Sequence, residues 1–208
     1  MDTYQDLAAK ATDSFTAEAE PSEPAAEPAG DRSLESTNPS DAIPIVSAPV
    51  PAPSGWSDPQ TGTDGPRYWD RLILSEAARV QRYERPATVV LVEIAGLTAL
   101  AQLWGPRVAE HTLAAAARTL SRQMRTSDHI ARLETLRFGL LLTETSEIAA
   151  INFVERARVA CERDLQVASE VVRVAFGWAS PPKGGDLSDA MALAVQRLEA
   201  ELAELVEG

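Results

Sequence analysis

The sequence predicts an α/β domain in which one sheet is covered by helices, and two observations support this class. After residue 56, helix-length segments with one apolar face alternate with short continuous apolar runs. Their order, α-β-α-α-β-β-α-β-α, fits a single sheet with helices packed on it. The chain has 208 residues, which is room for one ordinary domain and a tail.

The helices are recognised by apolar residues on one face and by residues that stop or cap them. They are expected at residues 68–83, 97–103, 108–124, 146–164 and 187–206. Arg85 and Pro86 end the first helix, because proline disfavours helical backbone in the residue before it. Gly105 and Pro106 separate the second helix from the third, and Ser146 supplies an N-cap for the fourth.

The strands are recognised by β-branched and apolar runs that are too short for helices. They are expected at residues 88–94, 129–133, 138–143 and 170–179. The first run, TVVLVEI, is apolar at nearly every position, as in a strand buried on both faces. The second and third runs lie close enough together to form a hairpin.

Residues 1–55 form an acidic tail of different composition, rich in Ala, Pro, Ser and Glu. The tail carries ten acidic and two basic side chains, so it holds −8 of the total net charge of −12. It is expected to be disordered, because it offers little apolar surface to offset chain entropy. The exception is residues 2–18, where Tyr4, Leu7 and Phe15 share one helical face. That face predicts a short helix that docks on another protein; the alternative is a fraying tail.

Composition excludes several classes of function. A strongly acidic chain does not attract nucleic acid or anionic lipid through its overall field. No apolar run approaches the ~20 residues of a membrane span, and the N-terminus lacks a signal peptide, so a cytoplasmic protein is expected. Cys161 is the single cysteine and is expected to be a small buried residue. His111 and His129 lie far apart in the expected fold, so we expect no metal site.

Five segments share the order and spacing of motifs in one known family. They are DPQTGTDGPRYWDRL at 58–72, RYERPATVVLVEI at 82–94, RTSDHIARLETLRFGLLL at 125–142, VERAR at 154–158 and VVRVAFGWA at 171–179. Together they resemble the GGDEF (diguanylate cyclase) family, and the resemblance covers residues 58–200. It implies a mixed, largely antiparallel central sheet of the nucleotide-cyclase type for residues 56–208.

The resemblance also implies a degenerate member without catalytic residues or a cofactor. Joining two GTP molecules is phosphoryl transfer, which needs metal ions held by carboxylates. The signature positions here are Glu134, Thr135, Leu136, Arg137 and Phe138, and only the phenylalanine agrees with the family. Leu136 replaces the metal-binding acid, and Arg137 inverts the charge of the next one. Glu93 keeps a carboxylate at the strand-end metal position, whereas Ala101 replaces the asparagine that recognises the base.

A second family site is better preserved, namely the inhibitory site that binds cyclic di-GMP in many members. Arg125 and Asp128 match its RxxD motif, and Arg156 matches the arginine of the following helix. Guanidinium groups pair with phosphate and guanine, and a carboxylate accepts hydrogen bonds from guanine N–H groups. The alternative is an exposed corner at which the arginine and the aspartate pair with each other.

Three functions remain open on this basis. The first is a non-catalytic receptor for cyclic di-GMP that uses Arg125, Asp128 and Arg156. The second is a module that binds no nucleotide and holds a protein partner through the tail or the domain surface. The third is a residual diguanylate cyclase. The first two share the interpretation that we favour, an enzymatically inactive regulatory module of bacterial cyclic di-GMP signalling.

Overall fold

The computed structural model describes residues 50–165 and 171–207. The sequence predicts a disordered tail at residues 1–55 and a short helix at 2–18; residues 1–49 lie outside the described residues, so both stay predictions there. Within the described residues 50–55, Val50 is fully buried in the hydrophobic core, so the packed domain begins a few residues earlier than the expected boundary at 56. Within the described ranges, no helix is both long and apolar enough to cross a membrane.

The domain is built on a six-stranded sheet with the strand order β1-β2-β4-β5-β3-β6. The strands are β1 (Ser57–Asp58), β2 (Thr63–Asp64), β3 (Ala87–Ala95), β4 (His129–Arg132), β5 (Arg137–Thr143) and β6 (Arg173–Ala179). Neighbouring strands are antiparallel, except that β2 runs parallel to β4. The mixed, largely antiparallel sheet and its hairpin are therefore confirmed. The sequence analysis missed β1 and β2, because two residues are too few to show a pattern.

Five helices flank this sheet in the described part of the chain. They are α1 (Pro66–Tyr83), α2 (Leu97–Trp104), α3 (Pro106–Gln123), α4 (Glu147–Asp164) and α5 (Leu187–Glu207). The side chain of Ser146 accepts a hydrogen bond of 3.3 Å from the backbone N–H of Ala149, which confirms the predicted cap of α4. Both α1 and α3 begin with proline, whose missing N–H is not needed in the first turn of a helix.

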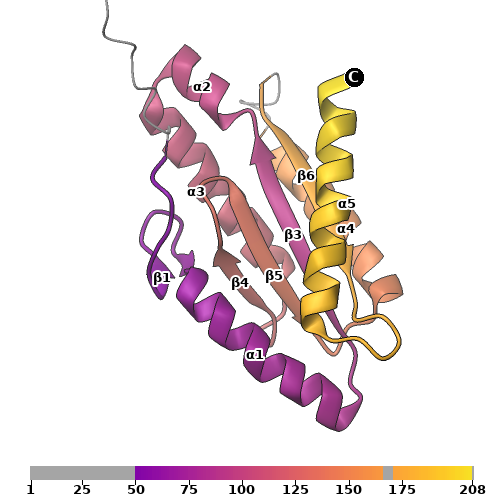
Figure 1. Cartoon of the computed structure of the whole chain (residues 1–208). Coiled ribbons are helices and arrows are strands. Elements are labelled where there is room, and N and C mark those ends of the chain that lie inside the picture. The colour runs from indigo at the N-terminus through magenta and orange to yellow at the C-terminus, as the bar shows by residue number, and fades with distance from the viewer. Residues whose placement is uncertain (1–49, 166–170, 208) are drawn as a thin grey trace, which may run out of the picture. The chain divides into compact units, whose positions relative to one another are not determined.

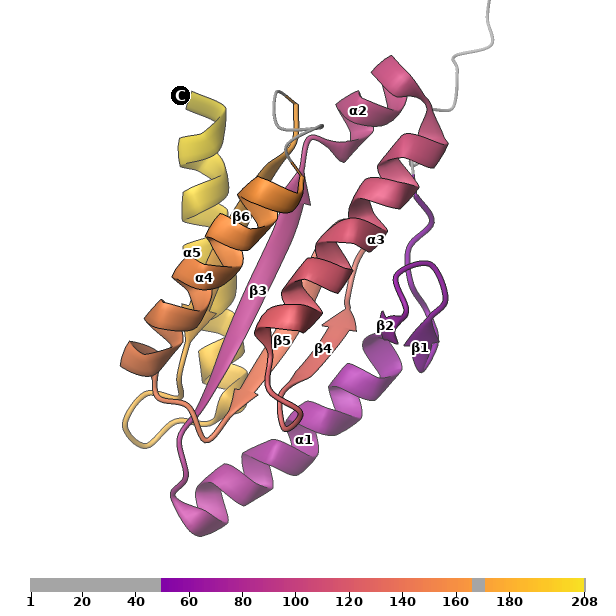
Figure 2. The ribbon, with the colours of Figure 1, turned by 180° about the vertical axis from the view of Figure 1, so that it is seen from behind.

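The helices form a layer on each face of the sheet (Figures 1 and 2). Helices α1 and α5 cover one face, and α2, α3 and α4 cover the other. Strand β3 lies inside the sheet and serves both layers, since Val89 and Leu91 face α1 and α5 while Val90 and Val92 face the opposite layer. Cys161 is buried on the inner side of α4, as expected from the sequence.

Buried Arg132 connects the start of the described chain to the hairpin between β4 and β5. Its side chain is fully buried, and it donates hydrogen bonds of 2.7 Å to the carbonyl of Pro51 and 2.8 Å to the carbonyl of Thr135. It also contacts Asp58 at 3.2 Å and Gln60 at 2.7 Å. One guanidinium group thus ties residues 51–60 to the hairpin between β4 and β5, which is more than 70 residues away in the sequence.

Candidate functional site

The loop between β4 and β5 carries the degenerate signature and closes without a glycine. The backbone N–H groups of Leu133 and Glu134 both point to the carbonyl of Arg137, at 2.9 and 3.3 Å. Thr135 is not among the described non-glycine residues with positive φ. The loop therefore turns through backbone conformations that ordinary residues adopt, and side chains project where the family has glycines.

The carboxylate at the strand-end position is paired with an arginine. Glu93 on β3 lies opposite Arg137 on β5 in the strand register. Arg137 Nε and Nη2 donate hydrogen bonds of 2.9 and 2.7 Å to Glu93 Oε2, and Nη1 lies 3.3 Å from Glu134 Oε1. Glu93 and Arg137 are each about one-fifth exposed. A guanidinium group therefore neutralises the carboxylate at the position where the family resemblance leads us to expect a metal ligand.

Leu136 and Ala101 both belong to the apolar interior beside α2 and α3. Each is partly buried and packs against the hydrophobic core on that face of the sheet. The backbone of Leu136 accepts a hydrogen bond of 3.0 Å from the N–H of Ile94. In the described ranges, no three metal-binding side chains come together. The residues expected at the positions of the signature acid and of the base-recognising asparagine thus pack against the core in this structure.

The three residues expected to bind cyclic di-GMP lie around one cavity. Arg125, Asp128 and Arg156 all line a hollow of about 120 Å³ between the end of α3, the start of β4 and α4. Asp128 Oδ2 accepts a hydrogen bond of 2.9 Å from the backbone N–H of Arg125, and Oδ1 accepts one of 3.2 Å from the N–H of Thr143. Backbone contacts, rather than the Arg125 guanidinium, therefore fix the aspartate, which differs from the side-chain pair considered above.

The two guanidinium groups at this corner are largely uncommitted. Arg156 donates one hydrogen bond of 3.2 Å, to the carbonyl of Asn152 on its own helix. The Arg125 guanidinium has neither a hydrogen-bond acceptor nor an ion-pair partner in the described part of the chain. Two cationic forks and a fixed carboxylate thus face one cavity, which is chemistry suited to a ligand with phosphates and amide-like N–H groups.

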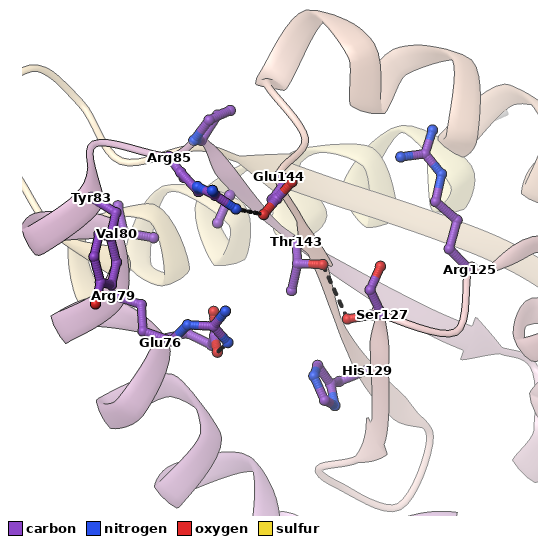
Figure 3. Close-up of a pocket in the computed structure, with 12 residues that line it drawn as sticks. Glu76, Arg79, Val80, Tyr83, Arg85, Arg125, Ser127, His129, Thr143 and Glu144 are labelled. Atoms are coloured by element: carbon purple, nitrogen blue, oxygen red, sulfur yellow. Dashed lines mark hydrogen bonds and ion pairs between the residues drawn. The ribbon is translucent and has the colours of Figure 1, made fainter.

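A larger hollow of about 730 Å³ lies beside this corner (Figure 3). Figure 3 shows Arg79 of α1 on one side and Arg125 on the other, with the ion pair between Arg85 and Glu144 in the middle. Arg79 is paired with Glu76 at 2.7 Å. Arg125 and Glu144 line both hollows, so the two spaces are neighbours. Arg79, Arg85 and Glu144 could not be predicted as neighbours in one hollow, because only the fold brings α1 and the end of β5 together.

His129 lines the larger hollow and has a structural partner. Its Nδ1 lies 3.1 Å from the hydroxyl of Tyr68. Burial raises the pKa of Tyr68, and the carboxylates of Asp64 and Glu76 raise it further, so the phenol stays neutral at physiological pH. Burial likewise raises the pKa of Asp64, against the opposing effect of His129. The histidine therefore joins β4 to α1.

Comparison with known protein families identifies the domain. The family described as "Diguanylate cyclase, GGDEF domain" matches residues 56–204. The chain belongs to the GGDEF family. Among curated proteins, the probable diguanylate cyclase DgcC of Escherichia coli strain K12 is 27% identical over 99 residues. That match covers 48% of this chain and 27% of DgcC, so the chain matches about a quarter of the length of this relative.

Several solved GGDEF structures share the fold. The GGDEF domain of DgcB from Caulobacter crescentus, in complex with c-di-GMP, has a TM-score of 0.65 at 15% identity and covers 73% of this chain and 92% of its own. The FimX GGDEF domain from Pseudomonas aeruginosa scores 0.63 at 16% identity, covering 73% and 96%. Diguanylate cyclase SiaD with its activator SiaC, also from Pseudomonas aeruginosa, scores 0.59 at 22% identity, covering 71% and 56%.

Proposed function

We propose that this GGDEF domain is a non-catalytic module that binds cyclic di-GMP at the corner formed by Arg125, Asp128 and Arg156. The observation that carries the proposal is the shared cavity, which these three side chains line. Both guanidinium groups are available there to an anionic ligand, whereas the arginines across the larger hollow already have carboxylate partners.

The ligand chemistry fits the geometry of this corner. Each oxygen of Asp128 accepts one backbone hydrogen bond, and a carboxylate oxygen has capacity for a second, from a guanine N–H. Arg125 and Arg156 supply donors for phosphate oxygens and for the Hoogsteen edge of guanine. The cavity of about 120 Å³ holds only part of the ligand, and the larger hollow next to Arg125 gives the remainder room.

The loss of catalysis follows from the other site. Transfer of a phosphoryl group requires metal ions beside the attacking and leaving oxygens. Here Glu93 is paired with Arg137, Leu136 packs on the core and Ala101 offers no hydrogen bond to a base. These three features support a domain that binds the cyclic dinucleotide without making it, and that needs no cofactor.

Calorimetric titration of the full chain with cyclic di-GMP tests the proposal. Loss of a charge-assisted contact to phosphate costs about 1.5–3 kcal/mol, so Arg125→Ala should weaken binding roughly ten- to hundred-fold. Arg118→Ala is the matched control, because Arg118 is exposed on α3 and does not line the cavity. Absence of saturable binding by the wild type at tens of micromolar ligand, or equal losses in both variants, would show that the receptor proposal is wrong.

The second candidate function is a protein-interaction module that binds no nucleotide. It is favoured by an apolar hollow between α4 and α5, which exposes two isoleucines. SiaD, a structural relative, is solved in complex with a protein activator. Copurification of a partner by a variant that cannot bind cyclic di-GMP would support this function over the first.

A further inference from the structure

Side chains occupy four backbone hydrogen-bonding groups along the outer edge of β6 and in the residue that follows it. This strand ends the sheet, so its outward backbone groups have no neighbouring strand. The contacts are Arg158 to the carbonyl of Val174 at 3.4 Å, the N–H of Phe176 to Glu201 at 3.2 Å, Arg197 to the carbonyl of Trp178, and the N–H of Ser180 to Glu147 at 3.1 Å. An added strand would have to displace charged side chains to pair with this edge.

The same four side chains form two ion pairs that join α4 to α5 across the edge. Arg158 Nη1 lies 2.7 Å from Glu201 Oε1, and Arg197 Nη1 lies 2.7 Å from Glu147 Oε1. The Arg158 guanidinium also stacks over the ring of Phe176, 4.8 Å from its centroid. The two ion pairs bridge α4 and α5 over the edge of β6. Because each pair is neutral, together they add no net charge there.

An apolar hollow of about 670 Å³ opens above these pairs. Its apolar lining is Ile148 and Ile151 from α4 with Phe176 and Trp178 from β6. Ile148 is 80% exposed and Ile151 is 44% exposed. They are three residues apart and therefore share one side of α4, which also buries apolar residues on its inner side. Two adjacent exposed isoleucines beside a hollow are typical of a surface that a partner covers.

The charges beside the hollow are acidic. Glu155 follows Ile151 by one helical turn on α4, and Glu204 follows Glu201 by three residues on α5. Both are exposed, and neither has an ion-pair partner among the described residues. Neither lines the hollow itself; each lies about one helical turn beyond a residue that does, so an unpaired carboxylate continues the wall on each helix.

We propose that the hollow between α4 and α5 docks an amphipathic helix of a partner protein whose apolar ridge is flanked by Lys or Arg. A helix is favoured over a strand because the edge of β6 is already occupied, and an apolar ridge is the part of a helix that enters such a groove. The basic flanks match Glu155 and Glu204. The proposal uses different side chains from the cyclic di-GMP corner, so either one can fail without the other.

Two peptides of identical composition test the proposal with the full chain. Each is a labelled peptide of roughly 18 residues, about five helical turns, made of Leu and Lys. In one the leucines have helical spacing, and in the other they alternate as in a strand. Fluorescence anisotropy should show saturable binding of the helical peptide and binding at least ten-fold weaker for the alternating one. A helical peptide with Glu in place of Lys should bind more weakly than the Lys peptide.

Variants locate the binding surface. Ile151→Glu should weaken binding of the helical Lys peptide at least ten-fold, whereas Leu74→Glu should leave it unchanged, because Leu74 is 75% exposed on α1, away from the groove. Thermal melts establish that both variants are folded. The proposal is overturned if the helical peptide does not saturate, if both variants lose binding equally, or if the alternating peptide binds as tightly.

Discussion

Arg137 lies opposite Glu93 in the pairing of β5 with β3, and its guanidinium group donates two hydrogen bonds to one carboxylate oxygen of Glu93. By its resemblance to the GGDEF motifs, this carboxylate stands at the position expected to hold a metal ion. An incoming cation would have to break both hydrogen bonds and then sit beside the displaced guanidinium, which repels it. The pair therefore opposes metal binding both by occupying the carboxylate and by its charge.

The first prediction is that the purified protein makes no cyclic di-GMP from GTP and Mg²⁺. Arg137 occupies Glu93, while Leu136 and Ala101 supply neither a carboxylate nor a base contact. Chromatography of the reaction mixture should show product no higher than in a mixture without protein. Product above that level, abolished by Glu93→Ala, would contradict the prediction.

The second prediction is that Glu144→Gln strengthens binding of cyclic di-GMP. Glu144 lines both hollows beside Arg125, so its carboxylate would repel the phosphates of a ligand bound there. Removing the charge also frees Arg85 from its ion pair. At surface dielectric the gain should be about 1 kcal/mol, or roughly three- to ten-fold in affinity by calorimetry. Glu162→Gln, the same charge change elsewhere, should alter affinity little, and a weaker Glu144→Gln complex would contradict the role given to Glu144.

The elements of this fold could be predicted from the sequence because their signals are local. The apolar run of β3, the proline at the start of α3 and the serine cap of α4 act within a few residues. Strands β1 and β2 could not be predicted in this way, since two residues show no alternation. Tertiary contacts support them in addition to the local turn, among them the hydrogen bond from Arg132 to Asp58 and the pairing of Asp64 with Ala131.

The residues of the candidate site could be named from the sequence, but the contacts between them could not. The family resemblance assigns Leu136 and Arg137 to the signature and Glu93 to the end of a strand, yet the hydrogen bonds of Arg137 to Glu93 depend on the register of β3 with β5. Likewise, Asp128 can accept a hydrogen bond from the N–H of Thr143 only because the hairpin brings the end of β5 back beside the turn that precedes β4. The register of two paired strands depends on tertiary structure, so a pattern of neighbouring residues cannot predict it.

The third prediction is that the thiol of Cys161 does not react in the folded protein. Burial raises the pKa of Cys161 to about 12, with Asp164 and Glu162 adding to the effect. The reactive thiolate is therefore almost absent at pH 8. A disulfide reagent should react slowly with the native chain and quickly with the chain in denaturant. Leu74→Cys, with the new thiol at a 75% exposed position, should gain one fast-reacting group, whereas a fast wild-type reaction would contradict the prediction.

The fourth prediction concerns acid stability through Glu147. Burial alone would raise the pKa of this carboxyl, but hydrogen bonds from Arg197 and from the N–H of Ser180 outweigh it, so the pKa is lowered. A lowered pKa in the folded state adds stability above the ordinary value of 4.5 and loses it as pH falls through the folded value. Urea unfolding should therefore show that the free energy of unfolding falls less steeply below pH 4.5 in Glu147→Gln than in the wild type. Equal slopes in the two proteins would contradict the assignment.

The fifth prediction is that Arg132→Met strongly destabilises the domain. Arg132 is fully buried, and Asp58 is only 4% exposed, so the substitution leaves a buried carboxylate without its cationic partner. Breaking a buried pair in this way costs about 3–5 kcal/mol. The carbonyls of Pro51 and Thr135 also lose their donor, which frees the start of the described chain and the hairpin together.

Urea unfolding measures this loss of stability. Two further variants serve as a control for an exposed ion pair and as a test of the coupling between Arg132 and Asp58. Arg122→Met removes an arginine whose side chain is 66% exposed and paired with Asp164, so it should cost no more than about 1 kcal/mol. Adding Asp58→Asn to Arg132→Met should cost less than the sum of the single changes, because the unpaired charge disappears. A loss below about 1 kcal/mol for Arg132→Met, or strict additivity in the double variant, would show that the buried pair does not hold these segments together.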